Sequence, residues 1–255
     1  MDKEKLKTFV HLLAEESAQV IRTYFARTDL KVESKADATP VTLADREAES
    51  RLRELIHHHY PEHGIIGEEF GSESTDAEFV WVLDPIDGTK SFITGVPLFG
   101  TLIGLMREGE PFLGAIHQPI LNQFCMGDNE TTTLNGRTIQ VRNTQQLDRA
   151  TLLTTDITDI VRYQNGDRWG QLVGSTGLLR TWGDCYGYLL VAGGWADIMV
   201  DPVVSPWDII PIVPIIRGAG GVITDWKGCD AVGGKSAIAA NTALHPKVMD
   251  ILNPE

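Results

Sequence analysis

The chain has 255 residues, 42% of them hydrophobic, with 22 Lys and Arg against 35 Asp and Glu for a formal net charge of -13. This composition suffices for a packed core and argues against a disordered chain, while the negative charge argues against nucleic acid and anionic lipid as partners. Three widely spaced cysteines without a C-x-x-C pair argue against a disulfide framework or a zinc site, and favour a reducing compartment.

Two amphipathic helices are expected first along the chain. Apolar residues three and four apart predict a helix from Asp2 to about Ala26, and its charged start does not resemble a secretory signal. A second helix begins near Leu43 and is stopped by Pro61. The polar segment between them is expected to form a loop or a short ribbon.

Strand-like runs separated by turn residues follow the second helix. They cover Gly64 to Gly67, Phe79 to Leu83, Phe99 to Met106, Phe112 to His117, Gln123 to Met126 and Thr138 to Val141. Short runs at this density predict an antiparallel sheet.

Strands and helices alternate after about Asn143. We expect a strand at Thr151 to Thr154, a helix near Gly183 to Val191, a strand near Ala196 to Met199 and a helix around Ile209 to Arg217. The longest apolar-rich region, Ile198 to Ile216, is interrupted by two aspartates and four prolines, so it does not predict a membrane span. We therefore predict a soluble cytoplasmic protein with an α+β domain over 1–143 and an α/β domain over 144–255.

Two carboxylates interrupt an apolar strand in the segment WVLDPIDGT, residues 81–89. Burial of unpaired carboxylates is costly, so Asp84 and Asp87 predict a bound cation. Pro85 prevents a regular strand, and the chain can then turn both carboxylates and the Ile86 carbonyl toward one point. Such oxygen ligands suit Mg²⁺ or Mn²⁺, which share their remaining positions with water and substrate phosphate.

An alternative interpretation is that Asp87 and Gly88 only form a hairpin turn, with Asp84 as a cap. Two further acidic positions with apolar flanks argue against it. Glu68 follows an apolar strand in IIGEEF, and Asp208 lies between Trp207 and two isoleucines in SPWDII. Acids on a solvated surface usually have polar neighbours, so the three positions together favour a metal site.

Gly88 and Thr89 fit a phosphate next to this metal site. If a short helix begins after Asp87, their amides point outward from its N-terminus, and the absent side chain of Gly88 lets an anion approach. Metals on one side and amides on the other predict phosphoryl-transfer chemistry.

The motifs GEE, DPIDGT and PWD, in this order, resemble the inositol monophosphatase superfamily of Mg²⁺-dependent, lithium-sensitive phosphatases over nearly the whole chain. Within it, residues 81–105 and RTWGDCYGY, residues 180–188, are most similar to the histidinol-phosphate phosphatase branch. The resemblance implies an α/β fold, a layered αβαβα sandwich, and a homodimer. It also implies two or three Mg²⁺ ions per site, with Mn²⁺ possible as a substitute.

The resemblance also implies residue roles. Glu68 and Thr89 would hold the attacking water with Asp45 behind them, and Gly88, Thr89 and Lys35 would lie at the phosphate. The implied metal ligands are Glu68, Asp84, the Ile86 carbonyl, Asp87 and Asp208.

Two further carboxylates bear on the choice of phosphate ester. Asp201 stands where the inositol enzymes have an acid that binds a substrate hydroxyl, and Asp184 stands where they usually have a small or neutral residue. Both suit the ammonium group and imidazole of L-histidinol phosphate, although Asp184 could instead be a helix N-cap. A substrate with two phosphates would need further Lys or Arg side chains near the site. Lys90 and Arg180 are candidates, so a bisphosphate substrate stays open. Inositol, sugar or nucleotide 3′-phosphates also stay open as substrates, as does a catalytically silent Mg²⁺-binding protein.

Overall fold

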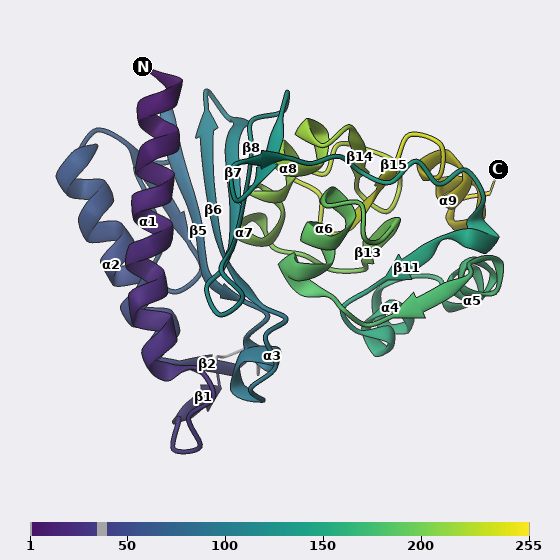
Figure 1. Cartoon of the computed structure of the whole chain (residues 1–255), viewed down its shortest axis with the longest axis horizontal. Helices are drawn as coiled ribbons and strands as arrows, with labels where there is room; N and C mark the ends of the chain where they lie inside the picture. Colours follow the sequence, from purple (N-terminus) through teal and green to yellow (C-terminus); the bar gives the residue numbers. More distant parts are fainter. Residues whose placement is uncertain (1, 35–39, 255) are drawn as a thin grey trace.

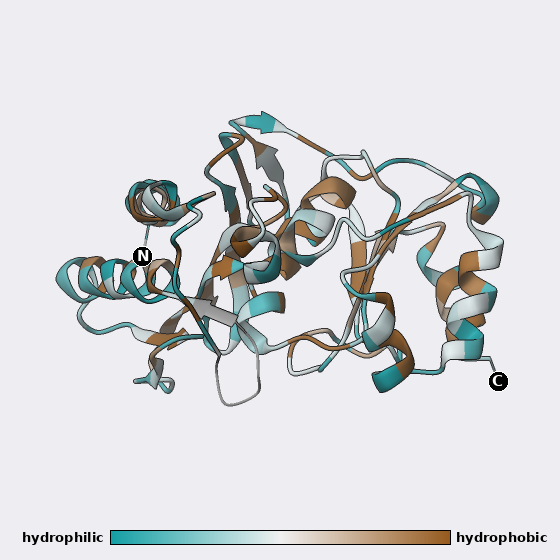
Figure 2. Cartoon of the chain, turned by 90° about the horizontal axis from the view of Figure 1, so that it is seen from below, coloured by the Kyte–Doolittle hydropathy of each residue, from teal (hydrophilic) through white to brown (hydrophobic). Residues whose placement is uncertain are grey.

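The computed structural model describes residues 2–34 and 40–254 of the chain. Helices and two sheets alternate in layers, which Figure 1 shows from the N-terminal helices on the left to the C-terminal helix on the right. The predicted layered α/β sandwich is confirmed. Figure 2 shows that the hydrophobic ribbon segments gather in the middle layers.

The first layer consists of α1 (Lys3–Tyr24) and α2 (Leu43–His59), at the positions that the sequence predicts. Asp2 caps α1 by accepting a hydrogen bond from the Glu4 amide, and Thr42 caps α2. The apolar faces of both helices cover one face of the large sheet in a cluster around Leu13, Leu52 and Trp81. A two-stranded ribbon connects the two helices, formed by β1 (Val32–Ser34) and β2 (Pro40–Thr42).

The large sheet has the strand order β10-β9-β8-β7-β6-β5-β3-β4. Its strands are β3 (Gly64–Gly67), β4 (Gly71–Glu73), β5 (Phe79–Asp87), β6 (Gly100–Arg107), β7 (Glu110–Gln118), β8 (Gln123–Gly127), β9 (Thr132–Leu134) and β10 (Arg137–Thr138). All neighbours are antiparallel except β3 and β5, so the predicted antiparallel sheet is largely confirmed.

One predicted strand, Thr138 to Val141, is mostly wrong. β10 ends at Thr138, and the Val141 amide donates to the Ala219 carbonyl oxygen at 3.0 Å instead of to a strand of the large sheet. The chain therefore leaves the large sheet here and crosses to the C-terminal layers. The connection includes a 3₁₀ turn, η1 (Leu147–Arg149).

The middle layer contains α6 (Asp184–Ala192), α7 (Pro206–Ile209) and α8 (Ile212–Gly218). The helix predicted around Ile209 to Arg217 is confirmed from Ile212 on as α8, but its start is wrong, because Pro211 separates α7 from α8 and cannot donate a helical hydrogen bond. Glycines let α8 lie directly on the large sheet. A methyl group at Gly114 would overlap the Pro211 carbonyl oxygen, and one at Gly127 would overlap the backbone at Ile215.

The small sheet has the order β12-β11-β13-β15-β14. Its strands are β11 (Thr151–Leu153), β12 (Leu178–Arg180), β13 (Ile198–Asp201), β14 (Gly221–Thr224) and β15 (Ala237–Asn241). β11 runs parallel to both β12 and β13. The outer face of the small sheet is covered by α5 (Gly166–Ser175) and α9 (His245–Leu252). Ile160 of α4 (Ile157–Tyr163) lies in the same apolar cluster.

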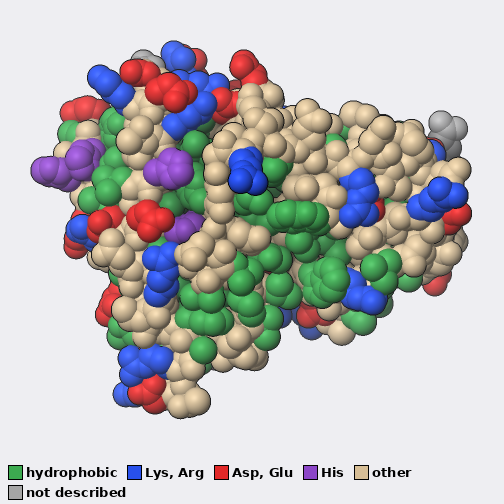
Figure 3. Space-filling view, viewed as in Figure 1, with side chains coloured by type: hydrophobic (Ala, Val, Ile, Leu, Met, Phe, Trp, Pro, Cys, Tyr) green, Lys and Arg blue, Asp and Glu red, His purple; other side chains and the backbone are tan. Residues whose placement is uncertain are grey.

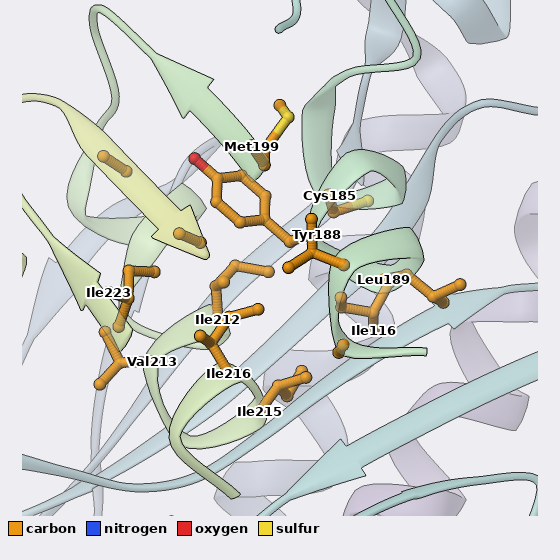
Figure 4. Packing of buried hydrophobic residues seen from close by; sticks show 14 of the residues in the cluster. Ile116, Cys185, Tyr188, Leu189, Met199, Ile212, Val213, Ile215, Ile216 and Ile223 are labelled. Atoms are coloured by element: carbon orange, nitrogen blue, oxygen red, sulfur yellow. The ribbon is translucent and has the colours of Figure 1, made fainter. Parts of the chain in front are cut away.

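The largest apolar cluster fills the space between the two sheets. It joins Ile116 of β7 to Leu189 of α6, Ile212 and Ile216 of α8 and Met199 of β13, as Figure 4 shows. The chain passes from one sheet to the other between β10 and β11, which is where the sequence places the domain boundary. Because this cluster spans both sheets, the division into 1–143 and 144–255 stays a prediction.

Within the described residues, no helix combines the length and the apolar character needed to cross a bilayer.

Candidate active site

The end of β5 carries Asp84 and Asp87 through an irregularity in the sheet. The strand continues to Asp87 instead of ending at Leu83, but its register against β6 shifts between Asp84 and Asp87. The Ile86 amide donates to Asp84 Oδ1 at 3.0 Å, and the Thr101 hydroxyl donates to the Pro85 carbonyl oxygen at 2.9 Å. The shift lets the carboxylates of Asp84 and Asp87 turn toward the same cavity, which the Ile86 residue also lines.

Gly88 and Thr89 continue from this strand into α3 (Thr89–Ile93). Gly88 has φ 92°, a left-handed conformation that glycine adopts without strain, and it lies at the N-cap of the helix. The Thr89 hydroxyl donates to the Ile86 carbonyl oxygen at 3.1 Å. Both residues line the same cavity, of about 230 Å³, and the amides that begin a helix have no acceptor within it.

Glu68 reaches this cavity from the tight turn between β3 and β4. Its amide donates to the Leu83 carbonyl oxygen at 3.2 Å, so the turn is fixed beside the end of β5. Glu68 also lies close enough to Asp84 to raise the pKa of the Asp84 carboxyl, after the larger effect of burial.

Asp208 comes from the first turn of α7, far along the chain. The Ser205 amide donates to Asp208 Oδ2 at 2.7 Å, which leaves Oδ1 for the cavity. A ligand oxygen from each of Asp84, Asp87 and Asp208 lies within 4.8 Å of the others. The structure therefore brings together acids that are far apart in the chain, as the sequence predicts.

Burial raises the pKa of all three carboxyl groups. For Asp84 and Asp87 the pKa lies well above the ordinary value, and for Asp208 burial raises it to about 7, with the neighbouring carboxylates adding to each shift. Such a set is unfavourable when ionised without a counter-charge. Buried, convergent carboxylates of this kind fit a hard divalent cation such as Mg²⁺.

Asp45 lies at the N-terminus of α2 and is almost fully buried. Its Oδ2 accepts hydrogen bonds from the Thr42 amide at 2.8 Å and from the Thr42 hydroxyl at 2.6 Å. Burial raises the pKa of Asp45, and the negative charge of Glu68 contributes to the shift. Among the described residues its hydrogen bonds go to Thr42, not to Thr89, so its predicted support of Thr89 stays a prediction.

A second cavity, of about 80 Å³, adjoins the first and holds the two predicted substrate carboxylates. Asp201 Oδ2 accepts a hydrogen bond from the Tyr188 hydroxyl at 2.9 Å, and its Oδ1 accepts one from the Thr155 amide at 3.3 Å. The two cavities share Asp87, Asp184, Asp208 and Thr155 in their linings. They therefore form one continuous cleft.

Asp184 lines both cavities. It is not the N-cap of α6, which was the alternative interpretation of this residue from the sequence. Gly183 is the N-cap of α6, and the first amides of the helix donate to side chains of other elements, Thr155 and Asp87. Asp184 has φ 50°, and its amide donates to the Thr155 hydroxyl at 2.8 Å. Burial and the charge of Asp201 raise the pKa of its carboxyl group to about 7.

Thr155, Asp156, Asp159 and Tyr188 line the second cavity but were not predicted. Asp156 follows β11 and caps α4 by accepting hydrogen bonds from the amide and hydroxyl of Thr158. The signal was present in the sequence: TTDITD follows a predicted strand, and ligands bind at the carboxyl ends of parallel strands. Asp201 ends the neighbouring parallel strand β13, so the two acids meet at one edge of the small sheet.

The cleft is strongly acidic. Lys90 is the cation among its described lining residues, and its ammonium nitrogen lies 3.9 Å from Asp156. Arg180 is outside both linings and lies over the ring of Trp182. Lys35 falls outside the described residues. The carboxylates in the linings are Glu68, Asp84, Asp87, Asp156, Asp159, Asp184, Asp201 and Asp208.

A family model described as "Inositol monophosphatase family" matches residues 2–254. The chain belongs to this family. It is accordingly a phosphoric monoester hydrolase of a metal-dependent family, as the sequence predicts.

Relatives and solved structures agree with this assignment. The chain is 39% identical over 234 residues to a histidinol-phosphatase of Chlorobaculum parvum, covering 91% of this chain and 90% of the relative. It is 35% identical over 247 residues to a histidinol-phosphatase of Mycobacterium tuberculosis, covering 94% and 95%. A solved inositol monophosphatase from Zymomonas mobilis is 36% identical, with a TM-score of 0.88 and 99% of each chain covered.

Proposed function

We propose that this family member hydrolyses L-histidinol phosphate to L-histidinol and phosphate, with Mg²⁺ as the cofactor and Mn²⁺ as a substitute. The observation that carries the proposal is the acid-lined second cavity, which opens directly into the cavity of the metal and phosphate motifs. Similarity to two histidinol-phosphatases supports it. The reaction would belong to histidine biosynthesis.

The second cavity suits a substrate with a cationic group. Within the described residues, the Asp184 carboxylate has neither a hydrogen bond nor an ion pair, so it is available to the substrate. The two acceptor bonds of Asp201 fix that carboxylate in place next to it. The ammonium and imidazole of L-histidinol phosphate would offset these charges, whereas a neutral polyol would leave them without a counter-charge.

The residues that would hold the metal are Glu68, Asp84, Asp87, Asp208 and the Ile86 carbonyl. Mg²⁺ bound there, two or three ions per site, would lower the pKa of water and stabilise negative charge on phosphate oxygens. Because the Thr89 hydroxyl donates its proton to the Ile86 carbonyl oxygen, the hydroxyl oxygen of Thr89 can accept a hydrogen bond from the attacking water.

The chain's own groups then account for the remaining steps. Glu68 and Thr89 orient a water toward phosphorus, with Asp45 behind them, and the amides of Gly88 and Thr89 hold the phosphate oxygens. Lys35 is proposed to lie near the same group. The water oxygen bonds to phosphorus and gives up a proton, the ester P–O bond breaks, and the leaving alkoxide takes a proton from solvent water to give L-histidinol, so that one water is consumed in all.

Phosphate release from a panel of esters tests the proposal. With Mg²⁺ present we expect kcat/KM for L-histidinol phosphate to exceed that for inositol 1-phosphate and for a nucleotide 3′-phosphate by about tenfold or more, since charge-assisted contacts contribute roughly 1.5–3 kcal/mol. A chelator should abolish release. Equal or faster hydrolysis of the neutral polyol ester would contradict the substrate assignment, and absence of all hydrolysis would favour a silent Mg²⁺-binding protein.

Inositol monophosphate is the second candidate substrate. It is favoured by the similarity to the Zymomonas mobilis inositol monophosphatase, which extends over the whole chain. The same panel separates the two. Other relatives are named fructose-1,6-bisphosphatase/inositol-1-monophosphatase, but a second phosphate would meet Lys90 as the one cation among the described residues that line this acidic cleft.

We also propose that the protein is a cytoplasmic homodimer. The described cysteines are free, which suits a reducing compartment. Leu178, Trp182 and Trp195 are exposed apolar side chains in the segments that precede and follow α6 in the chain. Figure 3 shows hydrophobic side chains gathered in the lower middle of one face, whereas acidic and basic ones are interspersed over α1 and α2. Light scattering after gel filtration would give the mass in solution.

A further inference from the structure

Glu49 is a fully buried carboxylate that the cleft itself does not contain. It lies in the middle of α2, and its two oxygens accept hydrogen bonds from the amides of Glu69, at 2.7 Å, and Phe70, at 3.2 Å. Those amides belong to the turn between β3 and β4, directly after Glu68. The carboxylate therefore binds the backbone of the turn that carries a residue of the proposed metal site.

Arg53 completes this arrangement from the next turn of the helix. Its Nε donates to Glu49 Oε1 at 2.8 Å, its Nη1 contacts Glu73 at 3.1 Å, and its Nη2 donates to the Gly71 carbonyl oxygen. One guanidinium group thus joins Glu49 to the β4 strand of the β3–β4 hairpin. Arg53 is only 12% exposed and Glu49 is fully buried, so water screens the bond between them weakly.

The position before Glu68 is also shaped by this carboxylate. A methyl group at Gly67 would overlap Glu49 Oε1 and approach Arg53 Nη2 at 2.7 Å. The backbone at Gly67 is outside the left-handed region, so glycine is needed here for space. The carboxylate consequently packs directly against the backbone that leads into Glu68.

We propose that Glu49 is a positioning residue: with Arg53 it clamps the β3–β4 turn so that Glu68 faces Asp84 at the metal site. The proposal rests on the assignment of Glu68 to that site but not on the identity of the substrate. Glu68 is attached to a turn of only a few residues whose far side, at Phe70, is exposed. Without the clamp, two amides of the turn lose their acceptor, and the bond from the Glu68 amide to the Leu83 carbonyl oxygen holds Glu68 less firmly in its direction.

Glu49→Gln tests the clamp because it keeps the size of the side chain and removes its charge. The amide nitrogen of Gln cannot accept, so at least one of the donors to this side chain loses its partner. We expect Mn²⁺ to bind this variant about 10- to 100-fold more weakly in paramagnetic resonance titrations without substrate, the usual range for groups that support metal ligands. The kcat should fall by a similar factor, while KM stays within about twofold because the contacts to phosphate are unchanged.

Arg53→Lys and Glu16→Gln are the comparison variants. Lysine cannot bridge Glu49, Glu73 and Gly71 together, so Arg53→Lys should weaken Mn²⁺ binding in the same direction but less. Glu16→Gln breaks the ion pair between Arg51 of α2 and Glu16 of α1, whose N–O distance is 2.7 Å. This pair also joins α2 to another element, but it does not contact the β3–β4 turn. It should bind Mn²⁺ like the unmodified protein.

Two results would overturn the proposal. One is unchanged Mn²⁺ affinity in folded Glu49→Gln and Arg53→Lys. The other is an equal loss in Glu16→Gln, which would show that any weakening of α2 has the same effect. Because Mn²⁺ binding is measured without an ester, a wrong substrate assignment would leave these outcomes unaffected.

Discussion

The half of the cleft formed by the large sheet holds its carboxylates differently from the half formed by the small sheet. Asp84 and Asp87 accept hydrogen bonds from backbone amides, of Ile86 and Cys185, and lie within reach of Asp208. In the other half, Asp201 accepts one bond from the Thr155 amide and one from the Tyr188 hydroxyl, and the Asp184 carboxylate has no bonded partner among the described residues.

The difference indicates which cation each half would hold. A rigid set of convergent oxygens, directed by the backbone, matches the demanding geometry of a small divalent ion. More dispersed carboxylates, some held by side-chain hydroxyls, match a larger organic cation whose charge is spread. Substitutions confined to one half separate the contributions of the two.

The largest effect is expected from Asp84→Asn or Asp208→Asn, in the metal half. Either change should lower kcat by about a thousandfold or more, because electrostatic stabilisation of the phosphoryl group is usually the largest catalytic contribution. Thermal unfolding without metal should show equal or greater stability, since a buried like charge is removed. Asp230→Asn, at an exposed pair with Arg217, is the control and should keep full activity. Near-normal turnover of Asp84→Asn or Asp208→Asn would refute the assignment of these residues to the metal site.

The metal-free protein should lose stability as the pH rises. Burial raises the pKa of Asp201 to about 6 and those of Asp184 and Asp208 to about 7, above the unfolded values. Their contribution is therefore complete below the unfolded pKa, near 4, and is lost as the pH rises through about 6 to 7.

Calorimetry in a chelator should show this loss as a lower Tm near pH 8 than near pH 5, by about 4–8 °C for each 2 kcal/mol of stability that is lost. Mg²⁺ added at the higher pH should restore the Tm, because it binds the folded state and offsets the charge. If the metal-free protein is equally stable at pH 5 and pH 8, or more stable near pH 8, the carboxylates of the two halves do not share a buried, unfavourable negative charge.

Asp184→Asn tests the substrate half alone. Asparagine tolerates the left-handed backbone at this position, so the substitution removes the charge with little strain. We expect kcat/KM for L-histidinol phosphate to fall by roughly tenfold, the lower end for a charge-assisted hydrogen bond, while the value for inositol 1-phosphate changes little. If the preference between the two esters keeps its original margin, Asp184 does not recognise the cationic group.

The smallest effect is expected from Asp156→Asn, at the rim of the second cavity. Asparagine remains a good cap for α4, so only the charge beside Lys90 changes. Because the pair is partly exposed, we expect a two- to threefold change in KM, roughly 0.5 kcal/mol. A loss as large as that of Asp184→Asn would show that the recognition of the cation is centred at the rim instead.

Part of the fold could be predicted from local pattern because the determining interactions lie within a few residues. The periodicity of α1 and α2 and the apolar runs of β3, β6 and β7 predicted those elements closely. The break between α7 and α8 could not be predicted from periodicity, because Pro211 interrupts a run that is apolar on all sides where the helix packs between two sheets.

By itself, the sequence determined where carboxylates interrupt or end apolar runs, and with them Glu68, Asp84, Asp87 and Asp208 as candidates for one site. The cost of burying a charge can be read from apolar neighbours in the chain, so this inference needed no coordinates. Only the tertiary structure decided that Asp156 and Asp159 join Asp184 and Asp201, and that Glu49 binds the turn of Glu68. Those contacts depend on the register of parallel strands and on which helix face meets which turn, and neither is encoded within a single local segment.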